Sequence, residues 1–162
     1  MRSLSRNAAL ALIGVTLVLH TTEEYLTFPA YLSSGNRLSR WLSPPALTQN
    51  PCNLDVALAL ATVLPLAVIV WAILRPRKAL LVSVLFLESV LLVNAGWHVF
   101  AAVLRGGYAP GVLTAVLINL PFGVYVLRRA VKEQWIPSQT AWLMIGIALA
   151  LHLAALGSLL AG

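Results

Sequence analysis

Histidine and glutamate side chains lie close together in the sequence at His20, Glu23 and Glu24, inside an apolar stretch. Residues three and four positions apart share one face of an α-helix, so this imidazole and these two carboxylates can point into one interior. Asn94 and His98 repeat the four-residue spacing in another apolar stretch. Imidazole and carboxylate groups bind zinc and iron in proteins, and they also serve as general acids and bases. The spacing therefore predicts a site for metal binding or acid–base chemistry built by separate helices.

Five apolar stretches must position these side chains. The chain has 162 residues, of which 60% are hydrophobic and 10% are charged, whereas an ordinary soluble domain carries about 25% charged residues. This composition excludes a soluble globular domain and a disordered chain. Each stretch approaches the roughly 20 apolar residues that cross a bilayer core as a helix. The expected fold is an all-α bundle of five transmembrane helices over residues 8–28, 54–74, 79–104, 111–127 and 140–160, with a long outer loop over residues 33–53.

The basic residues predict the orientation of this bundle. Eight of the 11 lysines and arginines flank the predicted spans on one side: Arg2, Arg6, Arg75, Arg77, Lys78, Arg128, Arg129 and Lys132. The positive-inside rule then places the N-terminus in the cytoplasm and the C-terminus outside. We expect residues 1–162 to form a single domain in a bacterial cytoplasmic membrane. Since topology accounts for the basic charge, we expect no nucleic-acid partner.

Ionisable side chains inside the predicted spans point to a functional site. A charged side chain at the centre of a bilayer costs about 2.5–3.5 kcal/mol on insertion scales, so such residues are functional candidates by default. From the helical rise, His20, Asn94 and His152 each lie roughly 3 Å outward of the midpoint of their own span. Glu24 and His98 each lie roughly 9 Å outward. We therefore expect one polar pocket in the outer half of the bundle, between the first, third and fifth spans.

Two further acidic residues do not belong to this level. Glu88 precedes His98 by ten residues, about 15 Å along a helix, so both cannot bind one ion. Asp55 opens the second span and is expected near the rim of the pocket. The roles of both carboxylates stay open at this point.

Three short motifs resemble a known family. Residues 20–24 read His-x-x-Glu-Glu, residues 94–98 read Asn-x-x-x-His, and residues 108–114 read Tyr-x-Pro-Gly-x-x-Thr. In this order they resemble the HXXEE-domain family of small integral membrane proteins. The resemblance implies a membrane protein suspected of being an enzyme, and it supplies no substrate. His152 belongs to none of the three motifs.

The first functional hypothesis is a metal-dependent membrane enzyme that acts on a lipophilic small molecule among the membrane lipids. The expected ligands of a divalent ion, zinc or iron, are His20, Glu24, His98 and His152. The expected catalytic groups are Glu23, Glu24, Asn94 and Tyr108. Whichever glutamate is not a ligand would be the general base, while the amide would ligate the metal or orient a ligand. The tyrosine hydroxyl could also reach the site.

Two other function classes stay open. A buried glutamate beside a histidine can protonate an alkene without a metal, and a five-span bundle with these groups one turn apart looks like the sterol isomerases related to the emopamil-binding protein. That analogy suggests an isomerase or cyclase of an isoprenoid or sterol-like lipid. A haem-binding or proton- or cation-conducting protein fits less well. Its histidines lack a flanking groove of small residues for haem, and five spans without a repeat suit alternating access poorly.

Overall fold

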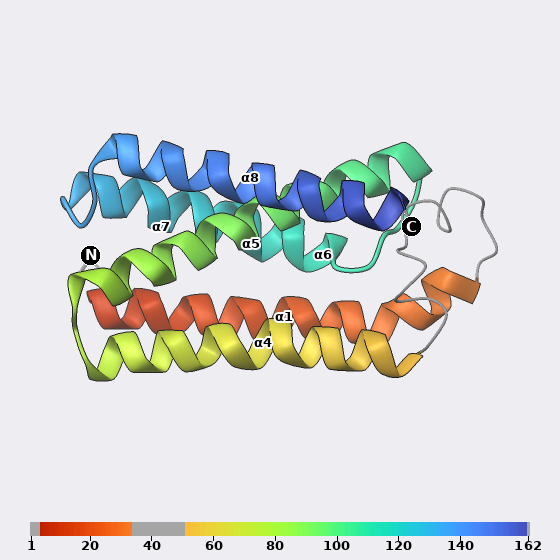
Figure 1. Ribbon diagram of the computed structural model, residues 1–162, viewed down its shortest axis with the longest axis horizontal. Coiled ribbons are helices and arrows are strands. Elements are labelled where there is room, and N and C mark those ends of the chain that lie inside the picture. Colours follow the sequence, from red (N-terminus) through yellow and green to blue (C-terminus); the bar gives the residue numbers. More distant parts are fainter. Residues whose placement is uncertain (1–3, 34–50, 162) are drawn as a thin grey trace.

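The computed structural model describes residues 4–33 and 51–161, which form helices lying side by side without any strand (Figure 1). Four long helices are α1 (Arg6–Ser33), α4 (Pro51–Leu74), α5 (Lys78–Arg105) and α8 (Ser138–Ala161). A fifth rod consists of three consecutive pieces, α6 (Val112–Thr114), the π-helical η1 (Ala115–Asn119) and α7 (Leu120–Lys132). The all-helical prediction is confirmed for this part of the chain. Most of the predicted outer loop, residues 34–50, lies outside the described residues.

Four of these five rods are long and apolar enough to cross a membrane. They are Asp55–Leu74, Lys78–Arg105, Val112–Lys132 and Ser138–Ala155. The predicted first span, α1, is 28 residues long but is not among them. Its histidine, threonines and two glutamates lower its hydropathy. The histidine and the glutamates contribute to the polar site, whereas the threonine hydroxyls donate to carbonyls of their own helix. The prediction of a membrane protein is therefore supported by four spans rather than five.

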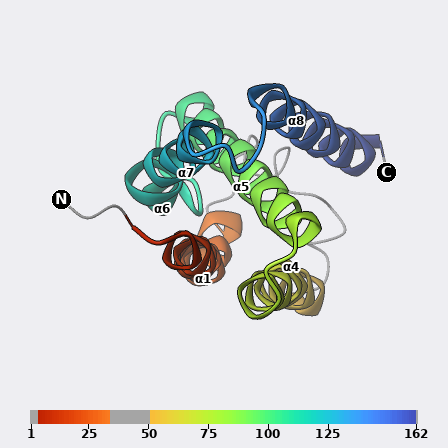
Figure 2. The ribbon, with the colours of Figure 1, turned by 90° about the vertical axis from the view of Figure 1, so that its left-hand side faces the viewer.

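Helix α5 occupies the middle of the bundle. It crosses between the α1–α4 pair and the group formed by α6, α7 and α8 (Figure 2). A fully apolar core packs around Ile13, Leu85, Val126 and Ile136, all of which are nearly inaccessible. This core lies toward the end of the bundle where Arg6, Arg77, Lys78, Arg129 and Lys132 gather, which we call the basic end. The polar site lies toward the opposite end.

The fifth rod is not a continuous α-helix, and Pro121 gives the reason. Proline has no amide hydrogen, and its ring clashes with the carbonyl four residues earlier. One turn before it the helix widens, so that the Leu120 N–H donates to the Ala115 carbonyl five residues back. Such π turns insert an extra residue into a helix and are frequent at functional sites. Here the wide turn separates Thr114, which contacts the site, from the regular helix α7.

Candidate functional site

Helices α1 and α5 bring three side chains of metal-ligand type together. One ligand atom each from His20, Glu24 and His98 lies within 4.8 Å of the other two. His98 Nε2 is 3.0 Å from one oxygen of Glu24, and His20 Nε2 is 4.0 Å from the other. The imidazole rings stand edge to face with centroids 4.9 Å apart. We call these three residues the His/Glu cluster; two imidazoles and a carboxylate also form known three-ligand catalytic zinc sites.

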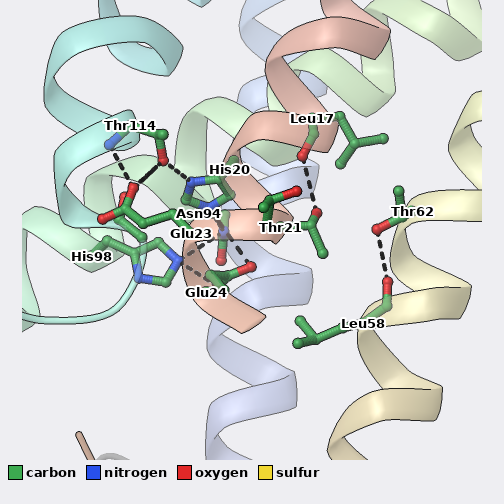
Figure 3. Close-up of polar contacts among 12 residues, drawn as sticks. Leu17, His20, Thr21, Glu23, Glu24, Leu58, Thr62, Asn94, His98 and Thr114 are labelled. Atoms are coloured by element: carbon green, nitrogen blue, oxygen red, sulfur yellow. Dashed lines mark hydrogen bonds and ion pairs between the residues drawn. The ribbon is translucent and has the colours of Figure 1, made fainter. Parts of the chain in front are cut away.

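Thr114 fixes the protonation of the first histidine. His20 Nδ1 is 2.8 Å from Thr114 Oγ1, and that hydroxyl donates to Glu23 at 2.6 Å (Figure 3). Since the hydroxyl proton is already donated, the hydroxyl oxygen can only accept from the imidazole, and His20 carries its proton on Nδ1. The lone pair of His20 Nε2 then points into the His/Glu cluster. Metal-binding histidines are commonly oriented in this way by a bond from their second nitrogen.

Glu23 holds the first turn of α6 against α1. Its carboxylate accepts the Tyr108 hydroxyl at 2.5 Å, the Leu113 N–H at 3.0 Å and the Thr114 N–H at 2.7 Å. The first amides of a helix have no partner within the helix, and a carboxylate there also interacts favourably with the helix dipole. Burial and the hydrogen bond to Glu23 raise the pKa of Tyr108, so the phenol stays protonated. With the Thr114 hydroxyl included, both carboxylate oxygens are fully engaged.

Asn94 connects the two histidines. Its Nδ2 lies 3.0 Å from His20 Nε2 and 3.0 Å from His98 Nε2, and an amide nitrogen has two protons to donate. His98 Nε2 also faces Glu24 at 3.0 Å. A single nitrogen cannot accept a proton from the amide and donate one to the carboxylate at the same time. The amide of Asn94 and the carboxylate of Glu24 therefore compete for His98 Nε2, and the tautomer of His98 decides which of the two contacts is a hydrogen bond.

Gly111 covers the His/Glu cluster with bare backbone. Its φ of +77° is one that side-chain-bearing residues rarely adopt. A Cβ at this position would lie 2.8 Å from His20 Cε1, 3.1 Å from Glu24 Cγ and 3.2 Å from His98 Cε1. The Pro-Gly turn therefore brings the chain over the cluster as closely as packing allows. Only glycine satisfies both the backbone angle and this close approach.

His152 lies beside the His/Glu cluster but not within it. Its ring packs on Trp97 with centroids 5.7 Å apart. Together with His20, Glu24 and Asn94 it lines a cavity of about 330 Å³. Its Nε2 is buried and has no hydrogen-bond partner among the described residues. Of the four predicted metal ligands, the structure thus groups three and leaves the fourth on the cavity wall.

The remaining acidic candidates lie elsewhere. Glu88 is buried on the face of α5 that meets α7, where a Cβ on Gly123 would be 2.8 Å from its Oε1. Asp55 is exposed near the start of α4 and lines a shallow groove with Thr22 and Tyr25. Neither carboxylate joins the His/Glu cluster. For Glu88 this agrees with its separation of ten residues from His98 along the same helix.

One role was not foreseen from the sequence. Thr114 stands in the sequence only as the last residue of the third motif, yet in the structure it links Glu23 to His20 and determines which imidazole nitrogen is free. The signal was present in the Pro-Gly-x-x-Thr motif, because a helix that begins after Pro-Gly has unpaired amides in its first turn. A carboxylate from another helix is a natural partner for such amides.

Comparison with known proteins agrees with the motifs. The family described as "Protein of unknown function with HXXEE motif" matches residues 11–126. The matched region contains all three motifs and the whole His/Glu cluster, whereas His152 lies beyond it. No curated protein and no solved structure matches the chain. Because the match covers most of its length, the chain belongs to this HXXEE family, as the motifs predicted.

Proposed function

We propose that this protein is a membrane enzyme that holds one divalent metal ion, zinc or iron, at His20, Glu24 and His98 and acts on a lipophilic substrate. The convergence of one ligand atom from each residue within 4.8 Å is the observation that carries the proposal. The hydrogen bond between His20 Nδ1 and Thr114 supports it further, because it leaves His20 Nε2 free to bind a metal. Three protein ligands leave a coordination position open, as in catalytic rather than structural zinc sites.

The proposal includes α1 as a fifth membrane span. Its 28 residues extend about 42 Å at the helical rise, more than a bilayer core requires. Its ionisable His20 is buried, while Leu12, Val15 and Leu19 are exposed toward the surroundings. With five spans and a cytoplasmic basic end, the N-terminus is cytoplasmic, the C-terminus is outside, and the cluster lies in the outer half of a bacterial cytoplasmic membrane.

The chain's own residues have distinct roles under this proposal. When bound, a divalent ion supplies a Lewis acid that activates water or a polar group of the substrate. Asn94 would donate to an oxygen of Glu24 or of the substrate, since an ion would use the Nε2 lone pairs of both histidines, and Thr114 keeps His20 in its metal-binding tautomer. Glu23 is a positioning residue, because both its oxygens already accept bonds. The general-base role therefore passes to the oxygen of Glu24 that the ion does not use.

Metal analysis of the detergent-purified protein tests this function. We expect close to one zinc or iron ion per chain after growth in supplemented medium, and a loss of nearly all of it in His20→Ala, Glu24→Gln and His98→Ala. Asp55→Asn is a matched control, since this carboxylate is exposed and outside the cluster. A protein that stays metal-free under these conditions, or variants that bind as much metal as the parent, would overturn the proposal.

A metal-free acid–base enzyme is the second candidate, and the 3.0 Å contact between His98 Nε2 and Glu24 favours it. Such a pair can pass a proton to one carbon of an isoprenoid or sterol-like lipid and remove a proton from another. The two candidates differ in one result. A metal-free protein that exchanges deuterium from solvent into such a lipid, with loss of exchange in Glu24→Gln, supports the isomerase.

A further inference from the structure

We propose that the cavity beside the His/Glu cluster binds a single-chain amphiphile with an uncharged oxygen in its head group, a hydroxyl or carbonyl. The chain of the amphiphile lies between α1, α4 and α5, and its head lies at His152. This inference specifies the lipophilic substrate and so rests on the proposed function for the reaction, although binding itself requires no metal.

The cavity has one polar end and an apolar remainder. Its volume is about 330 Å³, and its apolar walls include Leu17, Leu58, Pro65 and Leu91. The polar side chains His20, Glu24, Asn94 and His152 come together at one end. This division matches a molecule that has a polar head and a hydrocarbon tail, and it does not match a fully polar ligand.

The dimensions favour one flexible chain. Along α1 the lining runs from Ile13 to Glu24, which is about 16 Å at the helical rise. An extended chain advances about 1.2 Å per bond, so a tail of about 13 bonds fills this length. The volume lies near the lower limit of roughly 300–1,000 Å³ for ligand pockets, which suits one chain better than a two-chain lipid.

The charges at the polar end select the head group. Among the described residues no lysine or arginine lines the cavity, and Glu24 contributes a carboxylate. A phosphate head would find no cationic partner there. His152 Nε2 is buried without a hydrogen-bond partner in the described part of the chain, and burying such a nitrogen unpaired is costly. A hydroxyl or carbonyl oxygen next to this imidazole satisfies it, because the neutral ring can accept or donate.

The surroundings of the cavity indicate the route of entry. Ala57 and Ala61 of α4 and His152 of α8 all line the cavity. Ala61 lines the cavity and is also exposed. An amphiphile can therefore enter beside Ala61 from the surrounding lipid.

Photolabelling with a dodecanol that carries a diazirine in mid-chain tests the inference on the full-length protein in lipid nanodiscs. We expect labelled peptides from the cavity walls of α1, α4 and α5, and competition by unlabelled dodecanol but not by dodecyl phosphate. Ala61→Trp, or the milder Ala57→Leu, should reduce this labelling at least fivefold. Leu64→Trp is the matched control, because it adds the same ring to an exposed position of α4 outside the cavity. Labelling spread over the lipid-facing surface, or equal in all variants, would overturn the inference.

Two more variants separate this inference from the proposed function. His152→Phe keeps a ring against Trp97 and removes the nitrogen, so it should weaken dodecanol labelling about fivefold and leave labelling by a diazirine-bearing dodecane unchanged. Equal labelling by dodecanol in His152→Phe and the parent would refute the head-group assignment. His98→Ala removes a proposed metal ligand that does not line the cavity. Cavity labelling should persist there even as metal is lost, whereas loss of both would contradict a metal-independent binding site.

Discussion

Replacing Gly111 by alanine adds a side chain to the backbone segment that covers the His/Glu cluster, and so disturbs the cluster. The new Cβ would lie 2.8, 3.1 and 3.2 Å from atoms of His20, Glu24 and His98 respectively, and contacts below 3.4 Å force neighbours to move. A left-handed backbone costs a non-glycine residue about 1–2 kcal/mol. Overpacking adds about 1–3 kcal/mol. The atoms that must move belong to the proposed ligands, so the overpacking energy should weaken metal binding. We expect the metal affinity to drop about 10- to 100-fold.

Gly106 provides a matched control for this variant. Its φ is +66°, close to that of Gly111, but nothing lies within 4 Å of its hypothetical Cβ. The free energy of unfolding of Gly106→Ala should therefore fall only by the cost of the left-handed backbone. This variant should bind metal as tightly as the parent does. Competition titration with a zinc chelator gives the affinity, and thermal unfolding in detergent gives the stability. Equal metal affinity in Gly111→Ala and Gly106→Ala would refute the idea that Gly111 seats the cluster.

Substitutions at three further positions test other interactions. Thr114→Val removes the hydroxyl that orients His20 and should weaken zinc binding about 10- to 100-fold, while Thr114→Ser should restore it in the same titration. Glu23→Gln should lower the free energy of unfolding by about 1–2 kcal/mol, because its amide cannot accept four bonds; unchanged denaturant midpoints would contradict this. The Arg129 guanidinium lowers the pKa of Glu133 below its usual 4.5, so ionised Glu133 stabilises the fold above pH 4.5 and that contribution is lost as pH falls further. The melting temperature should thus fall less steeply below pH 4.5 in Glu133→Gln than in the parent.

Much of the candidate site could be predicted from spacing alone. A four-residue separation places His20 and Glu24 on one face of any helix, and the axial rise brings His98 to a similar depth on another helix. The first argument does not depend on how α1 is rotated, because both residues face the same way; the second gives only the depth of His98, and Asn94 four residues earlier indicates that this face of α5 is the polar one. The same reasoning separated Glu88 from the cluster by its axial distance.

Rotation about a helix axis explains what could not be predicted. The axial position of His152 along its helix correctly predicted its depth in the bundle. Axial position does not predict how a helix with few polar residues is rotated about its own axis. In the structure α8 presents this ring to Trp97 and to the cavity rather than to the ligand atoms. The π turn at Ala115–Asn119 and the fold of Gly111 over the cluster likewise depend on tertiary contacts.

X-ray absorption at the zinc edge of the zinc-loaded, detergent-purified protein tests the central claim most directly. The account predicts nitrogen and oxygen ligands at about 2.0–2.2 Å with the scattering pattern of two imidazoles in the parent, and almost no bound zinc in His98→Ala. A spectrum of hydrated zinc, or one that is the same in the parent and in His98→Ala, would contradict it.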